Sequence, residues 1–439
     1  MHTYSVVRGI THPLAFAAIG TLMAVSAGAQ IGARVAAAPD GEVRMTYAAR
    51  ARACGDGNDV VAIGQALNVY SSMESYGRWS GVTCVPGPAR VSITVRDHQV
   101  VGIRTRIGGS WRTGDGAVTD LGRVPAREAA AYFMSLAPAF TGSRRNPLLA
   151  AAVADSTDIA PDMLRLARDT SLSRETRRRA VNWAGALGDA SMVRPLVELA
   201  QHSADPERHN RDDVGPGDGM RGAAIGALSM LEDGAGVPAL LELARGNDPA
   251  SRKAAVFWLG QVDDARGRPL LRTIVADANE SEEIRGAAIF ALGQGNGAHD
   301  ADVAFLRDVF PRLPSERLKD RVLMAMSQSD SPESARWLVA IARNEQQPLE
   351  VRKKALFWAG QGHAQVADVL SVYTSTSDTR LREHVIFVLS QRDETAAIDA
   401  LMHIARSDDD RRMRSKALFW LAQKNDPRVT QLITELVAR

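Results

Sequence analysis

The sequence predicts a mainly α protein: an α-solenoid of about eight to nine two-helix repeats, preceded by a small α+β module. Two observations support this prediction. Near-identical segments recur through the C-terminal two thirds of the 439-residue chain, and a fixed period of about 20 to 50 residues is typical of solenoids. The alternation of apolar and polar residues that is typical of strands is confined to the N-terminal part. We therefore expect a signal peptide at residues 1–29, a module at 30–123 and the array at 124–439.

The first thirty residues have the features of a secretory signal peptide. Arg8 precedes an apolar run from Pro13 to Val25, and small residues end at Ala29, the spacing that a signal peptidase accepts. The run is shorter than the roughly 18 apolar residues that a membrane span needs. We expect cleavage near Ala29, a periplasmic or secreted protein and no membrane span.

The charge composition argues against a nucleic-acid partner. The chain has 53 Lys and Arg against 51 Asp and Glu, so it lacks the strong positive field that binds a polyanion. The charges are interspersed, as on a solvated helical surface. Export would also separate the chain from cytoplasmic partners.

Two cysteines occur in the sequence, Cys54 and Cys84. In an oxidising compartment a pair of cysteines in a small module is expected to form a disulfide. The alternative is a pair of buried thiols.

The module before the array carries the strand signal. Apolar and polar residues alternate from Val91 to Ile107, with a polar turn between the two halves, which predicts a β-hairpin. Residues 60–70 predict a helix. A small module needs large side chains to bury enough area, so the aromatic residues are expected to form its core: Tyr70, Tyr76, Trp79 and Trp111.

The repeats are recognised by three closely similar segments, at residues 252–261, 352–361 and 414–423. Weaker copies fill the intervals between them. With the last residue of each segment as a marker, equivalent positions are Ala154, Ala186, Met230, Gln261, Gln294, Gln328, Gln361, Gln391 and Gln423. The spacings are 30 to 34 residues except for one of 44, which a polar insert at residues 202–219 explains as an exposed loop.

Each marker helix follows a second amphipathic segment, so each unit is a helix pair, and a last unpaired helix at residues 427–437 suits a terminal cap. The paired helices, the Arg that opens each second helix and its Ala-rich body resemble short HEAT repeats of the phycobilin-lyase type over about residues 145–439. The resemblance implies a superhelix whose second helices line the concave side, usually to bind a protein. No lyase residues are transferred, because no catalytic motif appears and the array contains no cysteine.

Two rows of the second helix are expected to face inward. Ala or Val recurs six positions before the marker, and Val, Ile or Leu five positions before it, so both rows fall on one helical face. A basic residue recurs nine positions before the marker: Arg177, Arg221, Arg252, Arg285, Lys319, Arg352, Arg382 and Arg414. This basic row either binds carbonyls or an acid of the adjoining repeat, or forms a cationic stripe for an anionic ligand.

Aromatic and amide side chains recur away from that inward face. Amides can bind a peptide backbone of any sequence, and aromatic rings supply contact area, so these residues are the candidate binding stripe on the concave face. Its members are Phe257, Trp258, Gln261, Phe290, Gln294, Gln328, Phe357, Trp358, Gln361, Phe387, Gln391, Phe419, Trp420 and Gln423. The alternative is that the rings fill the seams between neighbouring second helices and that the amides cap the helix ends.

The sequence offers no catalytic constellation. It has no nucleophile elbow, phosphate-binding loop or zinc-protease helix. The best cluster of metal-ligating types lies in the insert, around His202 and His209, where a solvated loop is the more favoured interpretation. We expect no catalytic residues, no metal and no cofactor. The acids at Asp408 to Asp410 are expected to favour a helix N-terminus electrostatically.

Three functions remain open at this level. The first is an exported, non-catalytic scaffold that binds a protein or peptide along the concave face. The second is a lyase-like enzyme or enzyme accessory factor, and the third is a structural spacer in a cell-envelope complex. The sequence identifies neither the partner nor the oligomeric state.

Overall fold

The computed structural model describes residues 28–58, 60–63, 68–71, 84–111, 116–139, 147–203, 219–262, 264–294, 300–329 and 331–437. The chain divides into two compact units, Met1–Thr157 and Asp158–Arg439, and each is described by itself. The predicted signal peptide lies almost wholly outside the described residues. The first described helix, α1 (Ala29–Ala36), begins at the predicted cleavage point.

The N-terminal unit is built on a four-stranded sheet in the order β7-β6-β1-β8. The strands are β1 (Gly41–Tyr47), β6 (Ala89–Arg96), β7 (Gln99–Ile107) and β8 (Val118–Arg123). Only β8 runs parallel to its neighbour β1. The antiparallel pairing of β6 with β7 confirms the predicted hairpin. Asp97 and His98 form its turn, with the positive φ values that a tight two-residue turn needs.

One face of this sheet is buried under helices. Alternate residues such as Val43, Met45 and Ile93 are fully buried, as the two-residue period of a strand requires. The helices of this unit, besides α1, are α2 (Ala126–Leu136) and α3 (Pro147–Ala152), with the short 3-10 turn η1 (Ala137–Ala139). The Phe133 ring of α2 lies 6.3 Å from the ring of Tyr47, so this helix supplies the aromatic part of the core.

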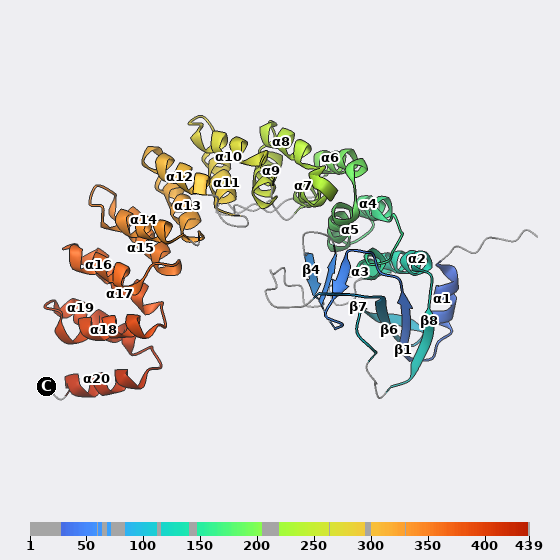
Figure 1. Ribbon diagram of the computed structural model, residues 1–439, viewed down its shortest axis with the longest axis horizontal. Coiled ribbons are helices and arrows are strands. Elements are labelled where there is room, and N and C mark those ends of the chain that lie inside the picture. The colour runs from blue at the N-terminus through green and yellow to red at the C-terminus, as the bar shows by residue number, and fades with distance from the viewer. Residues whose placement is uncertain are drawn as a thin grey trace, which may run out of the picture. The chain divides into compact units, whose positions relative to one another are not determined.

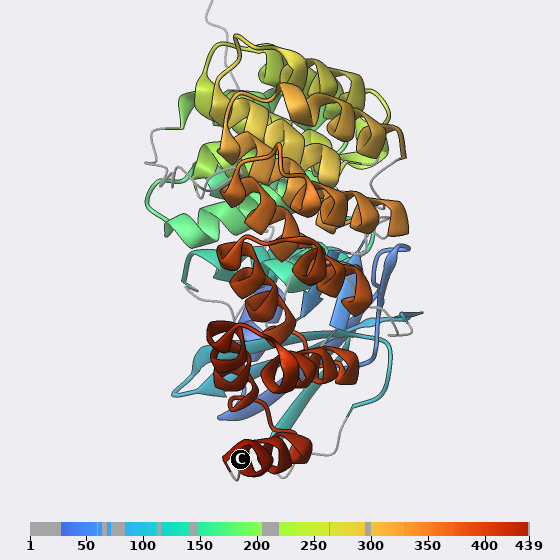
Figure 2. The same ribbon diagram turned by 90° about the vertical axis from the view of Figure 1, so that its left-hand side faces the viewer.

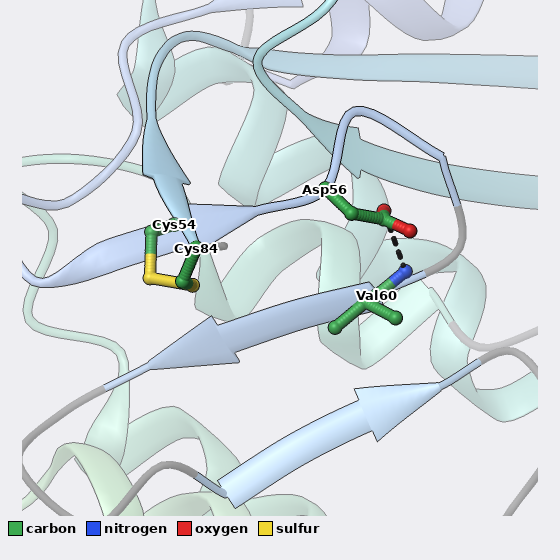
Figure 3. Close-up of a disulfide and its surroundings, with 4 residues drawn as sticks. All are labelled: Cys54, Asp56, Val60 and Cys84. Atoms are coloured by element: carbon green, nitrogen blue, oxygen red, sulfur yellow. Dashed lines mark hydrogen bonds between the residues drawn. A yellow bond between two sulfur atoms is a disulfide. The ribbon is translucent and has the colours of Figure 1, made fainter. Parts of the chain in front are cut away.

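A second, smaller sheet has the order β4-β3-β2-β5. Its strands are β2 (Ala53–Gly55), β3 (Val60–Ile63), β4 (Asn68–Ser71) and β5 (Val85–Pro86). The disulfide Cys54–Cys84 joins β2 to the start of β5, with the two Cα atoms 5.2 Å apart, which confirms the predicted pairing. Figure 3 also shows the Asp56 carboxylate accepting the Val60 N–H at 3.1 Å, which closes the turn between β2 and β3.

The predicted helix at residues 60–70 is wrong, because β3 and β4 pair as antiparallel strands there. Val60, Val61 and Ile63 are β-branched, and such residues favour strands. A short apolar run of this kind fits a strand as well as a helix until its partner strand is known.

The prediction that Trp111 is a core residue is wrong. Its side chain is half-buried, and its ring faces the guanidinium groups of Arg44 and Arg90, each 5.1 Å from a ring centroid. Tyr76 and Trp79, and the side chain of Tyr70, lie outside the described residues. Tyr47, Tyr132 and Phe133 are the buried aromatic residues instead.

The first unit extends beyond residue 123, where the sequence predicts that the module ends and the array begins. The Tyr47 hydroxyl donates to the Ala150 carbonyl at 2.6 Å, and Arg50 Nε donates to the Ala152 carbonyl at 2.7 Å. Ala49 also forms a β-bridge with Ala154. The segment around α3 therefore belongs to the core of the sheet unit, and the array starts at Asp158.

The second unit is a stack of helix pairs, eight of them among the described residues, and this confirms the predicted α-solenoid. The pairs are α4 (Ala160–Arg168) with α5 (Arg174–Leu187), α6 (Val193–His202) with α7 (Met220–Met230), α8 (Val237–Arg245) with α9 (Pro249–Gln261), α10 (Gly267–Ala276) with α11 (Glu282–Gly293), α12 (Asp300–Val309) with α13 (Glu316–Ser327), α14 (Pro332–Arg343) with α15 (Leu349–Gln361), α16 (Val366–Ser375) with α17 (Thr379–Ser390), and α18 (Thr395–Ser407) with α19 (Arg411–Leu421). The last helix, α20 (Pro427–Val437), packs against α18.

Short 3-10 turns link or extend some of these helices, namely η2 (Ala190–Met192), η3 (Glu232–Gly234) and η4 (Phe310–Arg312). The insert predicted as an exposed loop lies mainly at residues 204–218, outside the described part of the chain.

Each second helix packs against the second helix of the next pair, from α5 through α19. Figure 1 shows α7, α9, α11 and α13 on the inner side of the curve of this unit, with α8, α10 and α12 on its outer side. Figure 2, turned by 90°, shows the successive pairs stacking layer upon layer toward the C-terminus. The row six positions before the marker is fully buried, as predicted: Ala180, Ala224, Ala255, Ala288, Val322, Ala355, Val385 and Ala417.

The second helices approach closely where a glycine faces a neighbour. A Cβ added to Gly260 would lie 2.5 Å from the Cβ of Ala291 and 2.6 Å from its Cα. Since any side chain there would collide with the backbone of α11, the contact between α9 and α11 depends on this glycine.

Most second helices begin with a side-chain cap. The cap residues accept a backbone N–H of the first turn, which has no partner within its own helix. They are Ser173, Asp248, Ser281, Ser315, Asp378 and Asp410. Asp410 caps the N-terminus of α19, as expected for the acidic residues Asp408 to Asp410.

Candidate functional site

The candidate stripe lies on the second helices α9, α11, α13, α15, α17 and α19 or directly after them. We call this set of fourteen residues, from Phe257 to Gln423, the second-helix stripe. Its neighbours are set by the stacking of these helices, so residues about one repeat apart in sequence become adjacent in space. The structure shows which members face the seams and which face solvent.

The phenylalanine rings form contacts along and between neighbouring helices. The rings of Phe257 and Phe290 stack with their centroids 5.9 Å apart and an interplanar angle of 12°. Phe387 lies 5.5 Å from the ring of Trp420 on the next second helix. Phe257, Phe290, Phe357 and Phe387 are nevertheless only half-buried, so one part of each ring fills a seam and another part is accessible.

Phe419 differs from the other rings, because its side chain is 60% exposed. It touches Trp420 in an edge-to-face pair at 5.2 Å. A large apolar residue with this exposure is unusual at the end of a row that is otherwise half-buried. It is the most accessible aromatic member of the stripe.

The tryptophans are anchored by their neighbours in the stack. The ring of Trp258 lies against Gly226 of α7, since a Cβ at that glycine would come within 2.7 Å of it. Trp358 donates its indole N–H to an Asp320 carboxylate oxygen on α13 at 2.8 Å. Trp183 is fully buried. The tryptophan row thus contributes mainly to the contacts between repeats.

The amides form the accessible part of the stripe. Gln261, Gln328, Gln361, Gln391 and Gln423 are exposed. The half-buried amide of Gln294 donates to the side-chain oxygen of Gln328 on the next second helix.

Some of the amides also satisfy local groups, which matches the helix-capping alternative. Gln423 Nε2 donates to the Phe419 carbonyl at 3.4 Å, and Gln391 Nε2 donates to the Ser390 hydroxyl at 3.2 Å. The structure therefore brings together a row of half-buried rings bordered by exposed amides. Rings that fill seams and amides that bond locally both occur, in different repeats.

Several members of the basic row join the two helices of their own repeat or reach the next repeat. Arg285 Nε donates to the Val275 carbonyl at 3.1 Å, and Arg352 Nε donates to the Ala342 carbonyl at 2.9 Å. Both carbonyls lie near the C-terminal end of the first helix of the same pair, where carbonyls lack helical partners.

The forward contacts of this row reach an acid that precedes the next second helix. Arg252 pairs with Glu280, and Arg382 pairs with Asp408 at 2.6 Å. The sequence interpretation in which these side chains bind carbonyls and acids of the adjoining repeat is confirmed for these arginines. They hold repeats together rather than presenting a free cationic stripe.

Burial adjusts the ionisation of two groups along this seam. Burial raises the pKa of Tyr373, whose hydroxyl also donates to Asp408 at 2.5 Å. Burial lowers the pKa of His384, so its ring favours the neutral form, and its Nε2 lies 3.0 Å from the Lys353 carbonyl. Both groups therefore serve as hydrogen-bond partners between repeats.

The described residues contain no group of three or more His, Cys, Asp or Glu side chains arranged to hold a metal ion. Most of the His202 to Asp213 cluster lies outside the described part of the chain. Among the helices that the structure describes, none is both long and apolar enough to cross a bilayer.

Sequence reasoning missed a second group of residues, in the N-terminal unit. Arg44, Arg90, Arg104 and Arg106 line one cavity together with Trp111. The signal was present as basic residues on alternate strand positions, which share one face of a sheet. Which strands would lie side by side could not be known from the sequence.

Comparison with known proteins supports the repeat assignment. The sequence model of HEAT repeats matches residues 218–293 and 346–422, so the predicted HEAT repeats are present in the array. None of the curated protein sequences matches the chain.

Solved structures that are similar to part of the chain include the following two. The complex of CpcE and CpcF of phycocyanin lyase from Nostoc is 18% identical with a TM-score of 0.30, and the match covers 61% of this chain and 95% of that one. Human deoxyhypusine hydroxylase in complex with glycerol is 17% identical with a TM-score of 0.24, and the match covers 60% of this chain and 96% of that one.

Proposed function

We propose that this HEAT-repeat chain is an exported, non-catalytic scaffold that binds a protein or peptide partner along the second-helix stripe. The observation that supports it most strongly is the stripe's composition: half-buried rings bordered by exposed amides on consecutive stacked helices. Repeat arrays typically use such extended inner surfaces for binding.

The chemistry of the stripe fits an extended peptide segment. Exposed amides such as Gln361 and Gln391 can donate to and accept from a peptide backbone without regard to its sequence. Rings that are already held by seam contacts lose little freedom on binding, because pre-ordered side chains reduce the entropic cost of association. Phe419, with most of its ring exposed, supplies apolar area that a partner would cover.

The experiment uses short peptides selected from a random display library on the full chain. Peptides that bind the wild type are tested against Phe419→Ala and against the combined Phe357→Ala, Gln361→Ala, Phe387→Ala and Gln391→Ala variant. Binding is expected to weaken at least about tenfold in the combined variant and less in the single one, since buried aromatic contacts dominate interface energies.

Val85→Ala is the matched control, because Val85 is also exposed and apolar (51%) but belongs to β5 of the N-terminal unit. Thermal unfolding of each variant shows whether it is folded. Unchanged binding by a folded combined variant, or equal weakening in Val85→Ala, contradicts the proposal. A reproducible turnover or a co-purifying chromophore would favour the lyase-like alternative. Export is checked separately, by N-terminal sequencing of the protein recovered from the periplasm or medium.

A further inference from the structure

The N-terminal unit contains a cavity of about 450 Å³ that is independent of the second-helix stripe. One wall is the outward face of the sheet formed by β1, β6 and β7, and the rim includes Gly57, Asn58, Ser110 and Trp111. Small-molecule sites typically span about 300 to 1,000 Å³. The cavity is therefore large enough for a metabolite-sized ligand.

Four arginines face this space because of the strand register. Arg44 on β1 pairs with Ser92 on β6, which pairs in turn with Arg104 on β7. Arg90 on β6 lies directly opposite Arg106 on β7. The register therefore places two guanidinium groups side by side on one face of the sheet.

Arg90 is the buried member of the group, with only 4% of its surface exposed. Its Nε donates to the Gly108 carbonyl at 2.6 Å, its Nη2 donates to the Gly57 carbonyl at 2.8 Å, and its Nη1 donates to the Ser110 carbonyl. These acceptors satisfy its donors but carry no net charge. Burial and the neighbouring Arg106 both lower the pKa of Arg90.

The described lining of the cavity is mainly basic. Among the described residues that line it, Glu42 is the only carboxylate, and it pairs with Arg44 at 2.9 Å. The described lining therefore carries a formal charge of +3. Guanidinium groups bind carboxylate and phosphate oxygens with well-matched geometry.

Trp111 adds a flat wall to this basic lining. Its rings lie 5.1 Å from the guanidinium carbons of both Arg44 and Arg90. Cation–π contact of this kind fixes the planes of the two guanidinium groups. The arginines are thus held in place before a ligand arrives, which lowers the entropic cost of binding one.

We propose that this cavity is a binding site for a small oxyanion ligand that carries two or more carboxylate or phosphate groups. Arg104 and Arg106 contact the ligand's negative groups, while Arg90 supplies long-range attraction and anchors the rim. The proposal does not depend on the second-helix stripe, and a failure of either leaves the other intact.

Calorimetric titration of the full chain with citrate and, separately, with pyrophosphate tests the site in a buffer without polyvalent anions. Saturable binding of one ligand per chain is expected for at least one of the two probes, and the stronger of them assigns carboxylate or phosphate chemistry. Arg104→Gln combined with Arg106→Gln should weaken it at least about tenfold, or about 1.4 kcal/mol. Arg96→Gln is the matched control, because Arg96 is an exposed arginine of β6 that does not line the cavity. It should change the affinity less than about twofold.

A second readout separates a binding role from a structural one. Without ligand, thermal unfolding of the Arg104 and Arg106 double variant shows whether the variant is folded. At the same ligand concentration, the wild type should be stabilised more than the variant. The proposal is overturned if neither probe binds saturably, if the double variant binds as the wild type does, or if Arg96→Gln loses as much affinity.

Discussion

The two units are stabilised by contacts of different range. In the N-terminal unit, partners are far apart in sequence: β1 pairs with β6 and β8, and Arg34 donates to the Leu121 carbonyl. In the array, each helix meets its own partner and the next repeat. The first unit therefore depends on a few long-range strand pairings. The array, in its described part, consists of eight helix pairs that each contact mainly the neighbouring pairs. Damage should spread through the whole of the first unit and stay local in the second.

The disulfide offers the largest test of this difference. Replacing both Cys54 and Cys84 by Ser should lower the free energy of unfolding of the N-terminal unit by about 3–4 kcal/mol, because the bond closes a loop of about 30 residues in the unfolded chain. The array, whose sequence contains no cysteine, should be unaffected. Hydrogen exchange resolved by peptide measures both units in one sample. Equal loss of protection in the array would break the comparison.

Glycine replacement tests the local packing of the array. Gly260→Ala should destabilise by about 1–3 kcal/mol, since the new Cβ would collide with the Cα of Ala291. Gly286→Ala is the control on the neighbouring helix, because its Cβ would meet only side-chain atoms at 3.9 Å. That variant should be neutral or stabilise by up to about 1 kcal/mol, as alanine favours a helix over glycine.

Urea unfolding measures both variants, and hydrogen exchange locates the effect. Loss of protection in the variant Gly260→Ala should concentrate on α9 and α11. Similar stability of the two variants would show that the contact between α9 and α11 is looser than the distances from Gly260 to Ala291 indicate.

The bridge between repeats gives the smallest effect. A double-mutant cycle with Arg382→Met and Asp408→Asn should yield a coupling energy of about 1–2 kcal/mol, because the Asp408 side chain is only 9% exposed. The same cycle on Arg312 and Asp308, which are 66% and 76% exposed, should stay below about 0.5 kcal/mol. Thermal unfolding of the single and double variants gives both values. Equal couplings would mean that the bridge adds no more than a surface ion pair.

The array could be predicted from the sequence because residues one period apart become neighbours in the stack of repeats. Once residues 252–261, 352–361 and 414–423 are aligned, the buried Ala and Val row follows from helical geometry. The position of the Arg row follows too, but its choice between carbonyls and acids of the repeats and a free cationic stripe required the structure. The half-burial of Phe357 and the exposure of Phe419 could not be foreseen. They depend on how far each ring reaches across a particular seam, and the period does not encode that distance.

In the N-terminal unit, contacts between segments distant in sequence could not be predicted. The hairpin β6–β7 was predictable, since alternation and a tight turn lie within one stretch of chain. The pairing of β3 with β4 and the position of Trp111 were not, because each depends on a partner that the local sequence does not specify. The basic cavity belongs to the same class: its arginines come together only after β1 takes its place beside β6.

The two-way contacts of the arginine row have a consequence for how such a chain can change in length. Arg252 and Arg382 each reach forward to an acid before the next second helix, and Arg285 and Arg352 reach back to their own first helix. Among the described residues, the contacts of these four arginines stay within one repeat or reach the next one. Loss of one whole unit in the interior would leave the contacts of Arg285 and Arg352 with their own first helices intact, because these stay within one pair. It would replace only the acid that the arginine of the preceding unit meets, so a change in length by one helix pair alters a single interface between repeats.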